Sequence, residues 1–186
     1  MKTLKIGLCF LIILLFSACS KGEFRNIISF TDSYNNLSDY NLKLDDFIVQ
    51  DNEYTAFFEN CVLLHLKEDE NNKINICRVV AEKSSLSDNQ TKNIFIKTVR
   101  NTILAYCDFT SEETEKIIES FNFNDDEMFI KTGELTTHKD NFYFIYYANE
   151  ITCEMRIINT YIKDVDPTEK PVSKPYFGED FIEKSN

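Results

Sequence analysis

The feature that most constrains the fold is a helical block that lies between two blocks of strand-like sequence. Ser87 with Gln90, and Thr110 with Glu113, have the spacing of capping boxes, in which each pair satisfies backbone N–H groups at a helix start. The apolar residues of the first predicted helix share one face at helical spacing: Phe95, Ile96, Val99, Ile103, Tyr106 and Cys107. Because only Asp108-Phe109 separates the two predicted helices, we expect a helical hairpin.

The block before the helical hairpin predicts one helix and then two strands. Residues 24–37 have apolar positions at helical spacing and predict an N-terminal helix. Residues 40–49 alternate only weakly, which indicates a short strand or an extended segment. Residues 54–66 and 74–81 show the two-residue alternation of strands, and the acidic, asparagine-rich residues 68–72 connect them as a loop. We therefore expect a β-hairpin here.

The register of this β-hairpin decides whether two cysteines meet. If Leu64 faces Ile74, Cys61 lies directly opposite Cys77, and if Leu64 faces Ile76, the two cysteines are diagonal neighbours. Directly opposite residues at non-hydrogen-bonded positions come close enough for a disulfide. Cys61 and Cys77 are therefore a candidate disulfide. The alternative, in which the cysteines are buried free thiols that pack as small hydrophobic residues, stays open.

The block after the helical hairpin predicts further strands. Residues 128–132 and 135–137 form short strands, residues 142–148 form an interior strand that is apolar on both faces, and residues 151–161 alternate cleanly. A two-residue turn at Asn149-Glu150 makes every cross-strand partner apolar: Tyr146 with Cys153, Phe144 with Met155, and Phe142 with Ile157.

Strands on both sides of a helical pair are typical of an α+β fold. We expect an antiparallel sheet of about five to seven strands, with the helical hairpin and the N-terminal helix packed on one face. Residues 24–164 form this single domain. Residues 165–186 form a charged, proline-containing C-terminal tail.

The first residues have the pattern of a secretory signal. Lys2 and Lys5 precede the apolar run 6–16, and Ser17 and Ala18 provide a small-residue exit. The run is too short for a transmembrane helix, which needs about 20 apolar residues. We therefore expect the mature domain to lie outside the cytoplasm.

The end of this leader, Leu15-Phe16-Ser17-Ala18-Cys19, resembles the lipobox of bacterial lipoproteins, with Phe16 where Leu is usual. The resemblance implies that residues 1–18 are a removed signal peptide and that Cys19 carries acyl chains such as palmitate. Residues 19–23 then form a lipid-anchored tether. Ser20 after the cysteine favours the outer membrane or the cell surface over the inner membrane. An ordinary signal cleavage, which would leave the domain soluble, is the alternative.

Charge and glycine content limit the possible partners. The formal net charge of −11 becomes −13 when the leader and its two lysines are removed. An acidic chain disfavours nucleic acid as a partner and permits a cationic protein partner, although acidity also serves solubility alone. Only Gly22, Gly133 and Gly178 follow the leader, so the clustered glycines of nucleotide-binding loops are missing. We expect no cofactor.

The titratable candidates have weak sequence settings. His65 in a strand and His138 in a turn lack the sequence surroundings of a catalytic triad, so we expect no catalytic residue. The acidic run Asp125-Asp126-Glu127 lacks the glycine of a calcium loop, and we expect no metal site. In the aromatic run near the C-terminal end, Tyr143 and Tyr147 either pack under the helices or form a partner-binding surface on an exposed sheet face.

Three functions fit these patterns. The first is a non-enzymatic, lipid-anchored envelope protein that binds a macromolecule or acts structurally. The second is a lipoprotein that binds a small molecule or glycan in an aromatic-lined pocket between the sheet and the helical hairpin. The third, and the least favoured, is a hydrolase that uses paired carboxylates.

Overall fold

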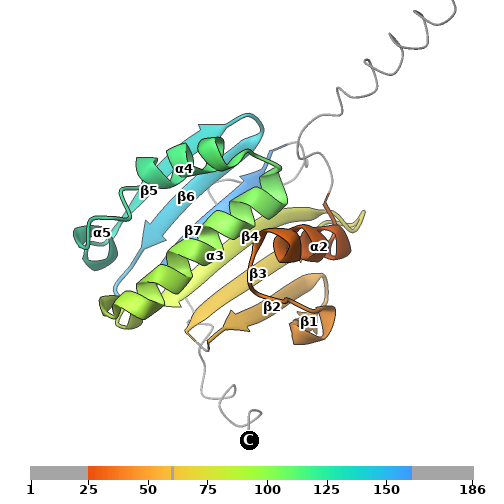
Figure 1. The fold of residues 1–186 in the computed structure, drawn as a ribbon, viewed down its shortest axis with the longest axis horizontal. Coiled ribbons are helices and arrows are strands. Elements are labelled where there is room, and N and C mark those ends of the chain that lie inside the picture. Colours follow the sequence, from red (N-terminus) through yellow and green to blue (C-terminus); the bar gives the residue numbers. More distant parts are fainter. Residues whose placement is uncertain (1–24, 60, 161–186) are drawn as a thin grey trace, which may run out of the picture.

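The computed structural model describes residues 25–59 and 61–160, and it contains a seven-stranded antiparallel sheet with helices (Figure 1). The predicted leader, tether and tail lie outside these residues. The elements have these bounds: α2 (Ile27–Leu37), η1 (Leu44–Asp46), β1 (Ile48–Gln50), β2 (Glu53–Phe58), β3 (Val62–Glu68), β4 (Ile74–Glu82), η2 (Ser85–Ser87), α3 (Asn89–Cys107), α4 (Ser111–Ser120), α5 (Glu127–Ile130), β5 (Gly133–Lys139), β6 (Phe142–Ala148) and β7 (Thr152–Asn159).

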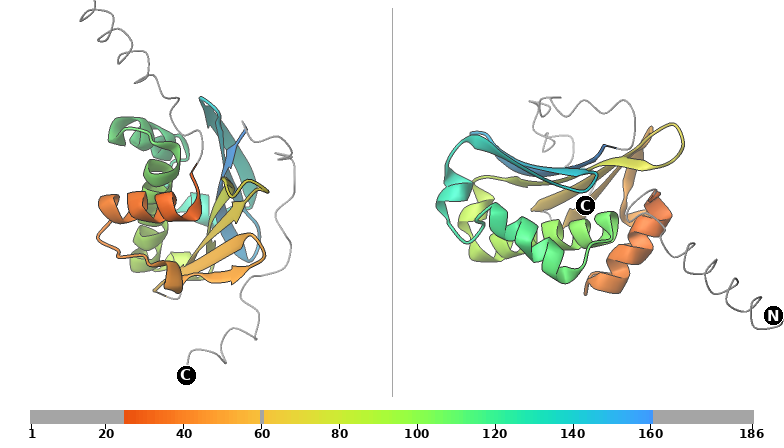
Figure 2. Two further views of the ribbon diagram at one scale, coloured as in Figure 1. Left: turned by 90° about the vertical axis from the view of Figure 1, so that its right-hand side faces the viewer. Right: turned by 90° about the horizontal axis from the view of Figure 1, so that it is seen from above.

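The sheet consists of two meanders that meet in its middle. Its strand order is β1-β2-β3-β4-β7-β6-β5, so β4 of the first meander pairs with β7 of the second. The helices α3, α4 and α5 connect the two meanders and lie with α2 on one face of the sheet (Figure 2). The predicted α+β class, the helical hairpin and the N-terminal helix on the same face are confirmed.

The core fills the space between the sheet and the helices. Phe95 of α3 is fully buried, as are Phe142 and Phe144 of β6. Phe121 and Phe123, which follow α4, stack on each other with ring centroids 5.7 Å apart. Burial of each such side chain stabilises the fold by roughly 1.5–3 kcal/mol. The aromatic content of the chain therefore serves mainly to join the two layers.

The helix starts agree with the sequence in one case and differ in another. Thr110 caps α4 by accepting a hydrogen bond from the Glu113 N–H, and the Glu113 side chain accepts one from the Thr110 N–H, as predicted. The predicted capping box of Ser87 with Gln90 is wrong. Asp88 caps α3 instead, because its carboxylate accepts the N–H of Thr91 at 2.8 Å. Aspartate is as good an N-cap as serine, so the sequence offered two adjacent caps.

The predicted strand over residues 128–132 is wrong, because residues 127–130 form the short helix α5. The Asp125 side chain accepts the backbone N–H of Glu127 at 3.0 Å and turns the chain. Phe129 is then buried against the ring of Phe95, at 6.1 Å between centroids. Packing of one aromatic side chain thus decides the local conformation. Residues 40–49, which alternated weakly, form η1 and the three-residue strand β1.

The β3–β4 hairpin has neither of the two registers considered for the candidate disulfide. Leu64 lies opposite Val79, and Leu66 lies opposite Cys77. Cys61 precedes Leu66 by roughly 17 Å of extended strand. The predicted Cys61–Cys77 pairing is therefore wrong, and the four cysteines of the described residues are all free thiols.

The turn explains this register. β3 continues through Glu68, which the sequence analysis placed in the loop, and a bulge lies between Lys67 and Glu68. The Asp69 carboxylate accepts the backbone N–H of Asn71 at 2.8 Å and of Lys73 at 2.9 Å. These bonds close a tight connection between the two strands. Each residue of β4 therefore pairs with a later residue of β3 than in either register considered from the sequence.

The β6–β7 hairpin is shifted from its predicted register by two residues, with Phe144 opposite Ile157. The Asn149 side chain accepts the backbone N–H groups of Ile151 and Thr152, each at 2.7 Å, and makes the turn longer than the predicted two residues. Because side chains alternate with a period of two, the shift keeps every side chain on its predicted face.

Candidate functional site

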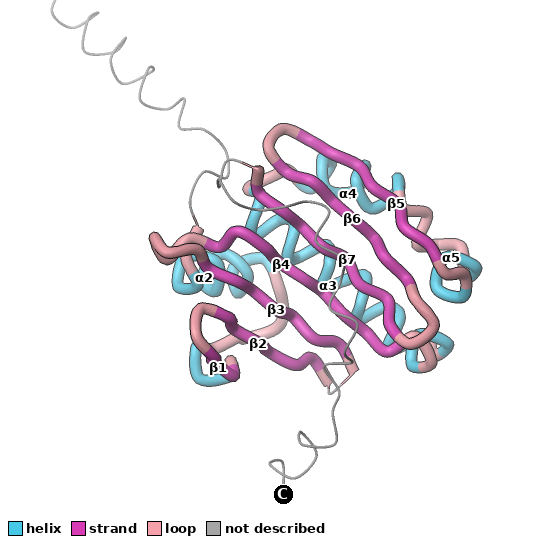
Figure 3. The backbone as a smooth tube through the Cα atoms, turned by 180° about the vertical axis from the view of Figure 1, so that it is seen from behind, coloured by secondary structure: helices cyan, strands magenta, loops and turns pink. Residues whose placement is uncertain are grey.

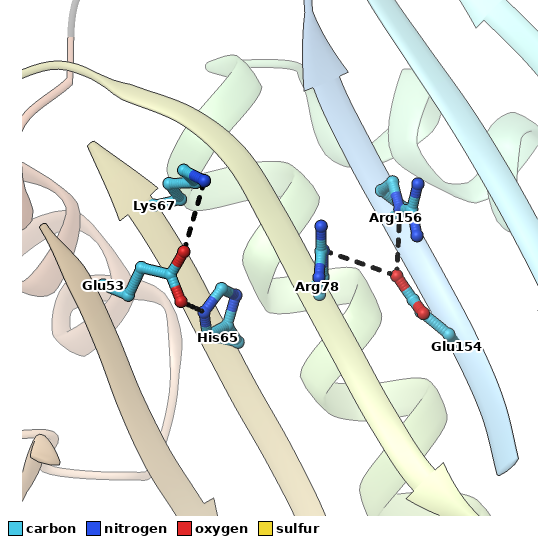
Figure 4. Close-up of polar contacts among 6 residues, drawn as sticks. All are labelled: Glu53, His65, Lys67, Arg78, Glu154 and Arg156. Atoms are coloured by element: carbon cyan, nitrogen blue, oxygen red, sulfur yellow. Dashed lines mark hydrogen bonds and ion pairs between the residues drawn. The ribbon is translucent and has the colours of Figure 1, made fainter. Parts of the chain in front are cut away.

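The sheet has a second face that the described helices do not cover, and we call it the open face (Figure 3). Three rows of side chains cross it from β2 to β5: Glu53, Lys67, Ile76, Ile158, Tyr143 and His138; Thr55, His65, Arg78, Arg156, Ile145 and Thr136; Phe57, Leu63, Val80, Glu154, Tyr147 and Glu134. Six of these residues form a polar cluster in the middle of the sheet (Figure 4): Glu53, His65, Lys67, Arg78, Glu154 and Arg156.

The polar cluster contains two arginines at directly opposite positions of the central strands β4 and β7. Arg78 pairs with Arg156 in register, and the two side chains are 5% and 4% exposed. Glu154 lies between them: its Oε1 accepts a 2.9 Å hydrogen bond from Arg156 Nε and lies 3.6 Å from Arg78 Nε. Like charges directly across a strand pair repel each other, so the Glu154 carboxylate compensates much of this repulsion.

The other half of the polar cluster is built around Glu53 of β2. His65 Nε2 donates to Glu53 Oε2 at 3.1 Å, and Lys67 Nζ lies 3.2 Å from Glu53 Oε1. Burial lowers the pKa of His65 below its ordinary value of 6.5; the hydrogen bond to Glu53 opposes this shift and the positive charge of Arg78 adds to it. The His65 ring is therefore neutral at pH 7.

The pKa of the Glu53 carboxyl is shifted in the direction opposite to that of an acid catalyst. Partial burial raises the pKa of Glu53, but hydrogen bonds and charges from His65 and Lys67 outweigh it, and the net pKa lies below the ordinary 4.5. A general acid in glycoside hydrolysis needs a raised pKa. Glu154 is paired with the guanidinium groups of Arg78 and Arg156. The contacts among the residues of the polar cluster are ion pairs and hydrogen bonds.

The predicted tyrosine pair lies on the open face, at the end formed by β5 and β6. Tyr143 is 39% exposed and its ring stacks with that of His138, at 5.9 Å between centroids. Tyr147 lies opposite Glu134 of β5 and is half-buried. We call Tyr143, Tyr147, His138 and Glu134 the aromatic end. The two histidines are brought onto one face of the sheet but onto separate strands, β3 and β5.

The remaining candidates are placed as follows. Cys19 lies outside the described residues. Within residues 25–59 and 61–160, no group of three or more metal-binding side chains could hold an ion. None of the helices in these ranges has the length and apolarity that a membrane crossing needs. The space between sheet and hairpin holds core rings such as Phe95 and Phe121.

Sequence reasoning missed the two facing arginines. The alternation of residues 151–161 correctly placed Glu154 and Arg156 on one side of their strand. It gave no sign that Arg78 lies opposite, because β4 and β7 are about 80 residues apart in the chain and only the folded sheet brings them together. The available signal was Arg78, a charged residue in the middle of the otherwise apolar strand β4.

Comparisons with known proteins find no matching family model, curated protein or solved structure. The function of this chain is therefore inferred from its own residues.

Proposed function

We propose that this chain is a lipid-anchored protein of the bacterial cell envelope whose α+β domain binds another macromolecule without catalysing a reaction. The aromatic end of the open face is the observation that carries the proposal. Tyr143 and Tyr147 lie there beside β5, one of the two edge strands of the sheet. Tyrosine offers a large contact area at a low cost in conformational entropy, which suits a binding surface.

A cationic protein partner fits the aromatic end best. Glu134 is exposed next to Tyr147, so a carboxylate and an aromatic ring lie side by side. A lysine or arginine side chain is stabilised by both groups, through charge and through the ring face. The net charge of −13 expected for the mature chain would add a long-range attraction for such a partner.

Affinity capture from an envelope extract tests this binding. The wild-type domain is compared with the double variant Tyr143→Ala/Tyr147→Ala, and Leu37→Ala, an exposed residue of α2, serves as the matched control. We expect one protein to bind the wild type and the control, to elute as salt rises, and to be lost with the double variant. Equal capture by the double variant would contradict a role for the aromatic end.

The anchor is tested separately. The resemblance of residues 15–19 to a lipobox supports acylation at Cys19, and several acyl chains make anchoring stable where one does not. In bacteria that express the full chain, we expect acylated Cys19 at the mature N-terminus by mass spectrometry and the protein in the outer-membrane fraction. Cys19→Ala should leave the protein unacylated, whereas Cys61→Ala should change nothing.

A small-molecule or glycan-binding lipoprotein is the second candidate. One observation favours it: the domain has a hollow of about 450 Å³ with three apolar lining residues, Leu86, Phe129 and Ile130, and six polar or charged ones, Lys83, Ser84, Ser87, Lys92, Asp126 and Glu150. Ligand sites combine apolar walls with polar groups that fix the orientation of the ligand. A thermal-shift screen of small molecules tests it, with Ile130→Asp, at an exposed position of the lining, expected to abolish any shift that the hollow causes.

A further inference from the structure

The centre of the open face is buried even though the described elements leave it uncovered. Leu63 is 0% exposed, Ile158 1% and Ile76 4%, and all three point away from the helices. No helix or strand of residues 25–59 and 61–160 passes over them (Figures 2 and 3). Side chains of this size become so inaccessible only beneath other atoms.

The buried part of this face is narrow. It comprises residues of four adjacent strands, β3, β4, β7 and β6: Leu63, His65, Ile76, Arg78, Val80, Glu154, Arg156, Ile158 and Ile145. Tyr143, also on β6, is 39% exposed and marks the edge of this strip. Neighbouring strands are about 4.8 Å apart, so the covered strip is only about 10–15 Å wide. A single extended segment matches this width better than a second folded domain.

The charges in the strip indicate which side chains the segment that covers it should carry. Arg78, Arg156 and Glu154 together carry a net charge of +1, and all three are less than 10% exposed. Burial of an excess charge is costly unless an opposite charge accompanies it. The segment that covers this strip should therefore carry carboxylates at the position of the two arginines.

We propose that residues 161–186 of the same chain fold back from the end of β7 over this strip, with Asp164 and Asp166 next to Arg78 and Arg156. β7 is a central strand, and the Thr160 N–H after it donates to the Asn141 carbonyl at 2.8 Å, so the segment starts beside the strip.

The reach of the segment matches the position of its first acids. Arg156 precedes Thr160 by roughly 14 Å of strand. A chain that reverses direction after Thr160 covers this distance in about four residues, which is where Asp164 and Asp166 stand in the sequence.

The rest of the segment also suits an extended path across the sheet. Pro167, Pro171 and Pro175 favour extended backbone and carry no N–H group that burial would deprive of a partner. Apolar side chains follow at Tyr176, Phe177 and further on, and they match the apolar Leu63 and Ile76. The aromatic end lies outside the strip, so this inference does not depend on the proposed function.

Paramagnetic relaxation in solution tests the proposal on the chain from Ser20 to Asn186, which lacks the thiol of Cys19. A nitroxide is attached to Ser173→Cys in a Cys61→Ser background, because Cys61 is the only half-exposed thiol among the four described cysteines. We expect loss of the NMR signals of Leu63, Val80 and Ile158, while Leu86 on the helical side keeps its signal. If the open-face signals keep full intensity, the segment does not cover the strip and the proposal is overturned.

A mixing experiment distinguishes cover of the strip by the chain's own segment from cover by the segment of a second copy. Spin-labelled protein without isotopes is combined with isotope-labelled protein without the nitroxide. We expect no signal loss in the mixture, since the segment acts within its own chain. Signal loss in the mixture would show that a second copy covers the strip and would overturn the proposal.

A charge variant tests the contact with the arginines. In Asp164→Asn/Asp166→Asn, we expect the signal loss at Ile158 and Val80 to decrease strongly. The matched control is Glu179→Gln/Asp180→Asn, which removes the same charge from the same segment and should leave the signal loss unchanged. Equal effects of both variants would contradict a specific role of Asp164 and Asp166.

Discussion

The Oε1 atom of Glu68 at the end of β3 lies 2.8 Å from the backbone nitrogen of Ile27, the first residue of α2. Oε2 of the same carboxylate accepts a 3.2 Å hydrogen bond from the Tyr54 hydroxyl. Glu68 is 5% exposed, so a buried negative charge lies at the positive end of the α2 dipole and fixes the helix to the sheet. The acidic loop that the sequence suggested thus contains a second structural carboxylate beside Asp69.

Replacement of Glu68 should therefore destabilise the domain. We expect Glu68→Ala to lower the free energy of unfolding by about 1–3 kcal/mol, because it leaves the Ile27 N–H buried without its acceptor. Glu68→Gln keeps an acceptor and should cost less. Chemical denaturation measures both, with the exposed neighbour Glu70→Ala as control. A Glu68→Ala variant as stable as the control would contradict the capping role.

The buried carboxylate of Glu154 gives a second prediction. Removal of its charge by Glu154→Gln leaves Arg78 and Arg156 facing each other, and loss of one partner of a buried ion pair costs about 3–5 kcal/mol. The double variant Arg78→Met/Glu154→Gln, which also removes a facing positive charge, should recover part of this loss. Unfolding free energies of the single and double variants measure the coupling. Strictly additive effects would show that the two residues do not interact.

His65 predicts how stability depends on pH. Burial lowers the pKa of the folded ring below 6.5, so as pH falls through about 6.5 the unfolded chain binds a proton before the folded chain does. Stability present above pH 6.5 is therefore lost as pH falls through 6.5 towards the lower folded pKa. Glu53 acts in the same direction only below its ordinary value of 4.5.

The variant His65→Gln should show a flatter decline in unfolding free energy between about pH 7.5 and about pH 5.5 than the wild type. His138→Gln, at an exposed position of β5, is the control and should keep the slope. An unchanged slope in His65→Gln would mean that His65 is not the group that titrates.

The thiols give a prediction about reactivity and oxidation. Burial raises the pKa of Cys77 and Cys107 well above 9.0 and that of Cys153 above 9.0, so few thiolates form in the folded state. In the chain from Ser20 onward, we expect a thiol reagent to modify Cys61 first and the others only on unfolding. In denaturant without reductant, four thiols should react. A count of two would instead indicate a disulfide.

The sequence predicted the fold class and most of the elements, but not the registers. The prediction of one strand over residues 54–66 is wrong, because these residues form the antiparallel strands β2 and β3. Elements follow from local periodicity and from side-chain caps, as in α4 with Thr110 and Glu113. The register of β3 with β4 does not, because Val79 and Val80 of β4 are buried on opposite faces and either face is apolar enough to be inside. The bonds to Asp69 decide it, and these form only in the folded turn.

The polar cluster was less predictable for the same physical reason. His65 was identified as a candidate and set aside, and its partner Glu53 lies on the neighbouring strand β2. Facing arginines require the β4–β7 pairing, which no local pattern encodes. The tyrosines of β6 were easier to place, because alternation alone puts Tyr143 and Tyr147 on the same side.

The central position of β7 has a consequence for folding during synthesis. The chain is synthesised from its N-terminus, and β4 obtains its second neighbouring strand only when β7, the last described strand, has been made. Until then β4 is an open edge with exposed N–H and C=O groups, a site for aggregation or for chaperone capture. For the exported protein proposed above, this delay would favour the unfolded state during export, because the sheet cannot close before β7 has been made.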